Sequence, residues 1–283
     1  MKDLATLFKL RLGTFVVLSA VLGWFMGSDT IGFIQFLELT VGGYLLTGAS
    51  NGFNQILEKR QDGLMDRTKN RPLPTGRMSS QKAVLLSSLA GIVGLAALFD
   101  LGPMAGGLGA LALVSYVLAY TPLKSRSTLS VFVGAIPGAI PPMLGYVAAT
   151  GHFGIEPGTL FAVQFMWQFP HFWAIAWVMH HDYLKAGYKM LPFAEGRTKR
   201  SARQILLYTL FTIPASMLPW ALPGYEMVGN VALVVCVLCG AGFSYYAFRL
   251  WRTLEIADAK RLMFASFAYL PLVQIIYVLD KIN

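Results

Sequence analysis

Long apolar runs alternate with short polar breaks along the whole chain. Nine of these runs are close to the length of about 20 residues that a helix needs to cross a bilayer. They lie near residues 10–28, 31–56, 81–99, 103–121, 128–149, 157–179, 203–222, 227–248 and 262–279. The pattern predicts an all-α polytopic membrane protein, with about nine transmembrane helices in one bundle and a single domain over residues 1–283.

The positive charges are distributed unevenly between the connections. Of the 23 Lys and Arg residues, all but Lys281 lie at the N-terminus or in four alternate connections, near residues 57–82, 124–126, 180–203 and 249–261. Cytoplasmic connections carry an excess of Lys and Arg in membrane proteins. The distribution therefore supports nine spans and predicts a cytoplasmic N-terminus.

Composition excludes several other classes of protein. Hydrophobic residues make up 55% of the chain and charged residues 13%, whereas soluble domains carry about 25% charged residues. This excludes a soluble globular enzyme, a disordered chain and a disulfide-rich secreted module. The net charge of +9 follows from the topology, and no aromatic residues interleave with a basic patch, so no nucleic-acid partner is expected.

The first long charged connection carries a candidate metal site. Asn54, Glu58 and Asp62 follow one another at intervals of four residues, so they share one face if the helix continues. Oxygen donors of this kind suit Mg²⁺, usually together with substrate phosphates. Arg67 and Arg71 could supply forked donors to phosphate oxygens. The alternative is an ordinary charged helix end whose arginines only follow the positive-inside rule.

A second polar cluster follows the sixth span. His171 and Asp182 are eleven residues apart and fall on nearly the same helix face. A polar group within a membrane span is costly and is a functional hypothesis by default, although His171 could simply be hydrogen-bonded within the bundle. Tyr120 and Lys124 end the fourth span on the same side of the membrane. The three clusters are therefore expected to form one site.

The fifth span is rich in helix-breaking residues. Its prolines and glycines are Gly134, Pro137, Gly138, Pro141, Pro142 and Gly145. Such residues are tolerated where neighbouring helices satisfy the backbone, and small residues permit close helix contact. We expect this helix to be kinked and to pack inside the bundle.

These motifs carry a family resemblance. The sequence contains Asn54-x-x-x-Glu58-x-x-x-Asp62, then Arg67-Thr68 and Arg71-Pro72-Leu73, and later Tyr120-x-x-x-Lys124. Together they resemble motifs of the UbiA superfamily of intramembrane prenyltransferases. The segments Gln168-Phe-Pro-His171-Phe-Trp and Asp182-Tyr183-x-x-Ala-Gly187-x-x-Met190-Leu-Pro192, with the fifth span, are similar to the haem-directed branch of that superfamily. The resemblance extends from about residue 9 to the C-terminus.

Two features depart from the wider superfamily. Glu58 stands where many members have Asp, which lengthens one ligand arm but keeps the carboxylate. The second motif carries paired acids elsewhere, whereas here Lys185 follows Asp182 and no second acid is near. This leaves Asp182 as the only acidic ligand from that side.

The resemblance implies transfer of a farnesyl group from farnesyl diphosphate to a vinyl group of haem b, with water addition, giving haem O and diphosphate. It also implies Mg²⁺ as cofactor, a bacterial-type cell membrane with the site facing the cytoplasm, contact with the lipid bilayer, and delivery of the product to a haem A synthase. Haem b is then a substrate and not a prosthetic group.

Roles follow residue by residue from the same resemblance. The expected Mg²⁺ ligands are Asn54, Glu58, Asp62 and Asp182, and Asp66 is grouped with them as a catalytic acid. The expected diphosphate-binding residues are Arg67, Arg71, Tyr120, Lys124 and Lys189. The expected haem-binding residues are His171, Trp173, Arg197 and Arg200. A dry cavity for the allylic cation is expected beside Phe165, Trp167, Phe169, Phe172 and Trp173.

Three other functions are considered. A UbiA-type enzyme acting on an aromatic quinone precursor would share the fold and metal site, but a paired-acid second motif is missing. A transporter would place ionisable residues near the midplane between broken helices, whereas here nearly all lie at one face. A haem-carrying redox subunit would require histidines placed as axial pairs, and only His171 is plainly within a span.

Overall fold

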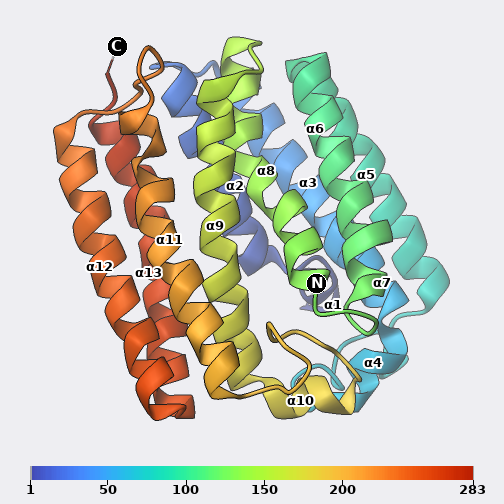
Figure 1. Ribbon diagram of the computed structural model, residues 1–283. Coiled ribbons are helices and arrows are strands. Elements are labelled where there is room, and N and C mark those ends of the chain that lie inside the picture. The colour runs from blue at the N-terminus through green and yellow to red at the C-terminus, as the bar shows by residue number, and fades with distance from the viewer. Residues whose placement is uncertain (1, 283) are drawn as a thin grey trace.

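The computed structural model describes residues 2–282, and within them nine long helical segments follow the nine apolar runs (Figure 1). The long helices are α2 (Leu10–Gly27), α3 (Phe33–Leu57), α5 (Ser80–Leu101), the continuous segment α6 (Pro103–Val114), η1 (Ser115–Tyr120) and α7 (Thr121–Leu123), α8 (Ser130–Thr150), α9 (Ile155–Val178), α11 (Lys199–Ala221), α12 (Asn230–Thr253) and α13 (Ile256–Leu279). The short helices are α1 (Lys2–Phe8), α4 (Lys59–Leu64) and α10 (His180–Lys185). The prediction of an all-α membrane bundle is confirmed.

Six of the long segments are apolar enough throughout to be candidate spans by composition: α2, α5, α6 to α7, α8, α12 and α13. The other three contain polar positions that interrupt the apolar run. Asn54 lies in α3, Gln168 and His171 lie in α9, and α11 begins with Lys199 and Arg200. All three of these helices carry residues predicted for the site: Asn54 in α3, His171 and Trp173 in α9, and Arg200 in α11.

Helix α8 packs against α2 at backbone distance. A Cβ atom at Gly145 would lie 1.8 Å from the carbonyl oxygen of Ala20, and one at Gly23 would lie 2.0 Å from that of Pro142. Of the apolar window of α8, 61% is buried, more than in any of the other five candidate spans of the described chain. The predicted position of this helix inside the bundle is confirmed, and its glycines make that position possible.

Side chains from neighbouring helices satisfy the interrupted backbone of α8. Pro142 has no N–H, so the carbonyl of Gly138 lacks its usual donor four residues later. Gln164 of α9 donates to this carbonyl at 2.6 Å, and Gln274 of α13 donates to the Gln164 side chain at 2.8 Å. Ser19 of α2 then donates to Gln274 at 3.0 Å. This buried relay joins α2, α8, α9 and α13.

The polar ends of the helices gather at one end of the bundle. Figure 1 shows α4 and α10 there, together with α1, while the C-terminus lies at the opposite end. Near this polar end the fourth span loosens into the π-helical turn η1, in which the Thr121 hydroxyl donates to the Tyr116 carbonyl at 2.9 Å. Such turns occur frequently at functional sites.

We expect Gly145→Ala to destabilise the bundle, because its methyl group would meet the backbone of α2 and no side chain there can move aside. Overpacking of this kind lowers the free energy of unfolding by about 1–3 kcal/mol. Gly158→Ala in α9 is the matched control, since a Cβ atom there meets nothing within 4 Å. Thermal unfolding in detergent measures both, and equal melting temperatures would contradict the close packing of α2 on α8.

Candidate active site

The predicted metal-binding residues lie at the junction between α3 and α4. The helix changes direction at Glu58, but its hydrogen bonds continue: the Glu58 N–H donates to the Asn54 carbonyl at 2.9 Å, and the Asp62 N–H donates to the Glu58 carbonyl at 2.7 Å. Asn54, Glu58 and Asp62 are 1%, 6% and 0% exposed. The spacing noted in the sequence thus places three oxygen-bearing side chains along one buried path.

Two buried ion pairs hold this path in place. Lys124 Nζ lies 2.8 Å from Glu58 Oε1, and Arg71 Nη1 donates to Asp62 Oδ2 at 2.7 Å. The second oxygen of Asp62 is buried and has no hydrogen-bond partner among residues 2–282. A buried acceptor without a partner is costly, so this oxygen is suited to a ligand that the chain itself does not supply.

Lys9 also belongs to this cluster, and sequence analysis missed it. Its Nζ lies 3.4 Å from Asn54 Oδ1, because a left-handed backbone at Lys9 separates α1 from α2 and turns the side chain inward. Burial, together with the charges of Arg71 and Lys124, lowers the pKa of Lys9 to about 7. In the sequence, Lys9 lies directly before the first span, where the orientation of the chain in the membrane is enough to explain a basic residue.

Aromatic rings enclose the ammonium group of Lys124. Its Nζ lies 4.6 Å from the centre of the Tyr120 ring and 5.8 Å from that of Tyr188. The backbone N–H of Lys189 donates to the Lys124 carbonyl at 2.8 Å, so the segment after α10 is attached to the end of the fourth span. The structure brings Tyr120 and Lys124 to the cluster, whereas the Lys189 side chain is exposed.

Asp182 connects the two charged segments. Its carboxylate accepts the backbone N–H groups of Asp66 at 3.3 Å and Arg67 at 3.1 Å. Asp66 itself is 58% exposed and pairs with Lys185 and Lys69, whose hydrogen bonds lower its pKa to about 2. The roles predicted for Asp182, Asp66 and Arg67 stay predictions, but in this structure these residues join loops.

Carboxylates alone do not form a metal cluster in the described chain. Within residues 2–282, no three His, Cys, Asp or Glu side chains come close enough together to hold an ion. A cation at the junction would therefore need the amide oxygen of Asn54, or substrate oxygens, in addition to Glu58 and Asp62. That donor set of neutral and charged oxygens suits Mg²⁺, which is usually bound through one or two carboxylates and phosphates.

The residues predicted to bind haem do not converge on one point. His171 Nδ1 lies 2.7 Å from the hydroxyl of Ser266 in α13, and its ring stacks on Trp167 with centres 4.4 Å apart. Trp173 instead packs against Phe169 and Tyr208, with ring centres 5.5 and 5.0 Å away. The side chains of His171 and Trp173, both on α9, therefore contact different helices, α13 and α11.

The two arginines in this predicted set have other partners. Arg197 donates to the carbonyl oxygens of Trp177 at 2.7 Å and Val178 at 3.3 Å, so it caps the C-terminal end of α9. Arg200 lies on the surface, with its guanidinium 3.9 Å from the centre of the Phe193 ring and 3.6 Å from Glu195. Their predicted role in binding haem stays untested.

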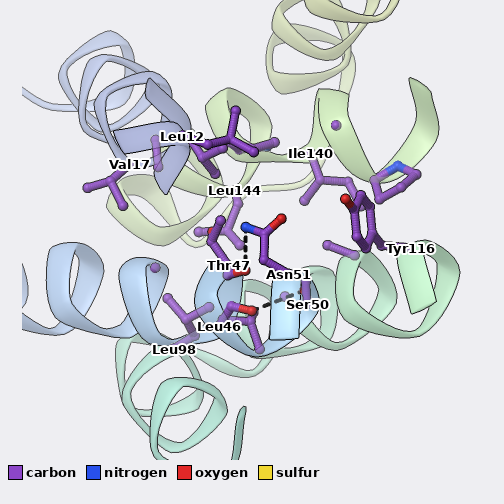
Figure 2. A pocket seen from close by; sticks show the side chains of 18 of the residues that line it. Leu12, Val17, Leu46, Thr47, Ser50, Asn51, Leu98, Tyr116, Ile140 and Leu144 are labelled. Atoms are coloured by element: carbon purple, nitrogen blue, oxygen red, sulfur yellow. Dashed lines mark hydrogen bonds between the residues drawn. The ribbon is translucent and has the colours of Figure 1, made fainter. Parts of the chain in front are cut away.

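A large apolar cavity opens one helical turn from Asn54 (Figure 2). It has a volume of about 800 Å³, open side included, and lies between α2, α3, α5, the α6–η1 segment and α8. Asn51 and Tyr116 border it on the side of the polar cluster, and aliphatic side chains form most of the remainder. Asn54 is connected to this border, because its amide donates to Thr121 at 3.2 Å and Thr121 donates to the Tyr116 carbonyl.

The cavity is not where the aromatic residues of α9 led us to expect it. Phe165 and Phe169 pack edge to face with ring centres 5.1 Å apart, and Phe169 also contacts Tyr208 of α11 at 4.9 Å. These rings pack on one another and on α11, and none of them lines the cavity described above. Tyr116 is the single aromatic residue among the cavity-lining residues of the described chain.

Residues 15–269 match the UbiA prenyltransferase family. The chain belongs to this family. It is 51% identical over 282 residues to the protoheme IX farnesyltransferase of Christiangramia forsetii. This match covers 99% of this chain and 94% of the relative. It is 46% identical over 285 residues to the protoheme IX farnesyltransferase of Flavobacterium psychrophilum, with 99% and 94% coverage. The predicted resemblance to the haem-directed branch is confirmed, and the chain is a membrane prenyltransferase.

Solved structures of distant relatives share the fold of this prenyltransferase. A structure of digeranylgeranylglyceryl phosphate synthase superposes with a TM-score of 0.79 at 17% identity, covering 99% of this chain and 97% of the other. A UbiA homologue from Archaeoglobus fulgidus, bound to DMAPP and Mg²⁺, gives a TM-score of 0.73 at 15% identity, covering 98% and 99%. At these identities the likeness concerns the fold alone.

We expect Asp62→Ala to abolish turnover in this prenyltransferase while the protein stays folded in the membrane. The change removes a buried carboxylate and leaves Arg71 without its partner, so we expect activity to fall at least about a hundredfold. Asp3→Asn is the control, because Asp3 forms an exposed ion pair with Arg77 at 3.2 Å. Near-normal turnover of Asp62→Ala, measured with equal amounts of folded protein, would contradict the assignment of this cluster.

Proposed function

We propose that this chain transfers the farnesyl group of farnesyl diphosphate to a vinyl group of haem b, with addition of water, giving haem O and diphosphate. The single observation that carries this proposal is the apolar cavity beside a buried cluster of carboxylates and cations. A prenyl diphosphate has the same two parts, a hydrocarbon chain and a polyanion. The identity of 51% to a protoheme IX farnesyltransferase supports haem b as the acceptor.

The cluster is proposed to bind Mg²⁺ through Asn54, Glu58 and Asp62, with Asp182 assigned as a further ligand by the sequence motif. The unpartnered, buried oxygen of Asp62 supports this assignment. When bound, Mg²⁺ neutralises negative charge that grows on the departing diphosphate. The bound DMAPP and Mg²⁺ in the UbiA homologue from A. fulgidus are consistent with this chemistry.

The cations of the chain are proposed to hold the diphosphate. Arg71 and Lys124 lie beside Asp62 and Glu58, and Lys9 adds a third basic group near Asn54. Fixed positive groups in a site of low dielectric stabilise developing negative charge without reorganisation at the moment of reaction. Arg67, Tyr120 and Lys189 complete the proposed set, with Tyr120 acting through its contact with Lys124.

The proposed reaction breaks the bond between farnesyl C1 and the diphosphate oxygen. The terminal vinyl carbon of haem b then forms a bond to C1, and positive charge appears on the inner vinyl carbon. Water adds to that carbon and releases a proton, which leaves a hydroxyl group. The aliphatic wall of the cavity excludes other water from the farnesyl chain.

His171 is proposed to contact haem b. The Ser266 hydroxyl donates to the Met263 carbonyl at 2.6 Å, so it can accept but not donate in its 2.7 Å contact with His171. His171 Nδ1 then carries the proton, and Nε2 keeps a free electron pair, which is the form that binds haem iron. The contact partners of Trp173, Arg197 and Arg200 are compatible with roles around the same substrate only if these side chains reorient.

The protein is proposed to lie in a bacterial-type cell membrane with the polar end of the bundle facing the cytoplasm. The bias of Lys and Arg towards the connections at that end supports this orientation. Haem O is poorly soluble in water, so a haem A synthase in the same bilayer is the expected recipient of the product.

A product assay tests the proposed function. Purified protein in detergent is mixed with haem b, farnesyl diphosphate and Mg²⁺, with and without a chelator. The haems are then separated, and their masses are measured by mass spectrometry. We expect a haem heavier by one farnesyl and one hydroxyl group, which disappears with the chelator. Prenylation of an aromatic acid in the same buffer, with haem b unchanged, would contradict haem as the acceptor.

We expect His171→Ala to weaken binding of haem b by at least about tenfold, because an axial ligand and its stacked surface are lost. Titration of the haem absorption band with protein measures the affinity, and the position of the band reports the ligand of the iron. His152→Ala, at an exposed histidine near the opposite end of the bundle, is the control. An unchanged band and affinity in His171→Ala would contradict the assignment.

A further inference from the structure

The apolar cavity is open at one end and closed at the other. Leu12, on the side of the polar cluster, is 49% exposed, whereas Leu39 and Leu98 are 0% and 1% exposed. Leu98 is the one residue that α5 contributes to the lining, because this helix passes behind the cavity and reaches only its far end. Ligands can therefore enter beside the polar cluster but meet a wall of leucines at the other end.

The depth of the cavity follows from the helices along its sides. On α3 the lining runs from Asn51 to Leu39, which is twelve residues and about 18 Å at the rise of an α-helix. On α2 it runs from Leu12 to Ala20, which is eight residues and about 12 Å. An extended chain of three isoprene units measures about 15 Å and one of four units about 20 Å, from ordinary bond lengths.

We propose that Leu39 and Leu98, with Gly109 beside them, form a stop that limits the prenyl chain to three isoprene units. This inference rests on the proposed function, because it assigns the cavity to the prenyl group of the donor substrate. A fourth unit would extend past the open lining and into the buried leucines at the closed end. Since these leucines belong to a packed core that includes Leu108 and Leu144, they cannot move aside without disturbing several helices.

Gly109 sets the width of the closed end. A Cβ atom there would lie 2.8 Å from Leu98 Cδ1 and 3.0 Å from Leu46 Cδ2, and all three residues line the cavity. Figure 2 shows Leu46 and Leu98. A methyl group at this position therefore displaces two leucine side chains that bound the space for the last isoprene unit. Gly107, on the same helix, has nothing within 4 Å of such an atom.

The test compares geranyl, farnesyl and geranylgeranyl diphosphate as donors, with haem b as acceptor. We expect Leu98→Ala to raise kcat/KM for geranylgeranyl relative to farnesyl diphosphate by at least about tenfold, because it removes part of the wall. We expect Gly109→Ala to lower kcat/KM for farnesyl diphosphate about tenfold, while the value for geranyl diphosphate changes less than about threefold. Leu89→Ala and Gly107→Ala are the matched controls on α5 and α6, and Leu98→Val replaces Leu98→Ala if that variant does not fold.

A binding measurement separates this inference from the proposed function. The unreactive thiolodiphosphates of the same three chain lengths are added to each protein, and the shift of the melting temperature is recorded. If the wild-type protein prenylates no haem with any donor, the proposed function fails, and the order of the three shifts still tests the stop. The three analogues are ranked by the shift of the melting temperature that each causes. The same ranking in wild type, Leu98→Ala, Leu98→Val and Gly109→Ala would overturn the proposed stop.

Discussion

The pairing of buried charges at the polar end of the bundle is the constraint on which the site depends. Glu58 and Asp62 lie where the helix leaves the apolar interior, and each has a basic partner from a different segment, Lys124 and Arg71. Removing one member of a buried pair leaves an uncompensated charge and costs about 3–5 kcal/mol. The pairs therefore fix the α3–α4 junction against the end of the fourth span and the loop after α4, and only in that arrangement do the polar cluster and the cavity become neighbours.

One helix carries both halves of the site. One face of α3 lines the cavity between Leu39 and Asn51, and Asn54 begins the polar cluster one turn later. A rigid helix keeps a polyanion and its hydrocarbon chain at a constant distance, which a loop would not do. The low dielectric of the apolar side also strengthens the electrostatic interactions on the polar side. Affinity for the two parts of an amphipathic substrate thus comes from one continuous element.

Sequence patterns predicted the spans, the inward position of the fifth one and the motif residues around Glu58, because these depend on local periodicity and composition. Contacts between distant segments were not predictable in this way. Lys9 was explained by membrane orientation alone, and Thr121 and Ser266 belong to no motif. Their contacts form only when helices that are far apart in the chain pack together. The aromatic residues of α9 were assigned to a cavity, but rings spaced four residues apart on one helix pack on one another. Arg197 was assigned to haem, whereas in the structure it caps the C-terminal end of α9.

The contact of Asp182 with the backbone of Asp66 and Arg67 has a consequence for biogenesis. The partners are 116 and 115 residues apart, so at about 5–20 residues per second the first segment waits roughly 6–23 s for the second. Until α9 and α10 have been inserted, the segment after α4 lacks the side chain that fixes its backbone. A nascent or truncated chain that ends before this point contains the acidic motif but not its complete enclosure. A chain that ends before Asp182 therefore carries Glu58 and Asp62 without the carboxylate that binds the backbone after α4.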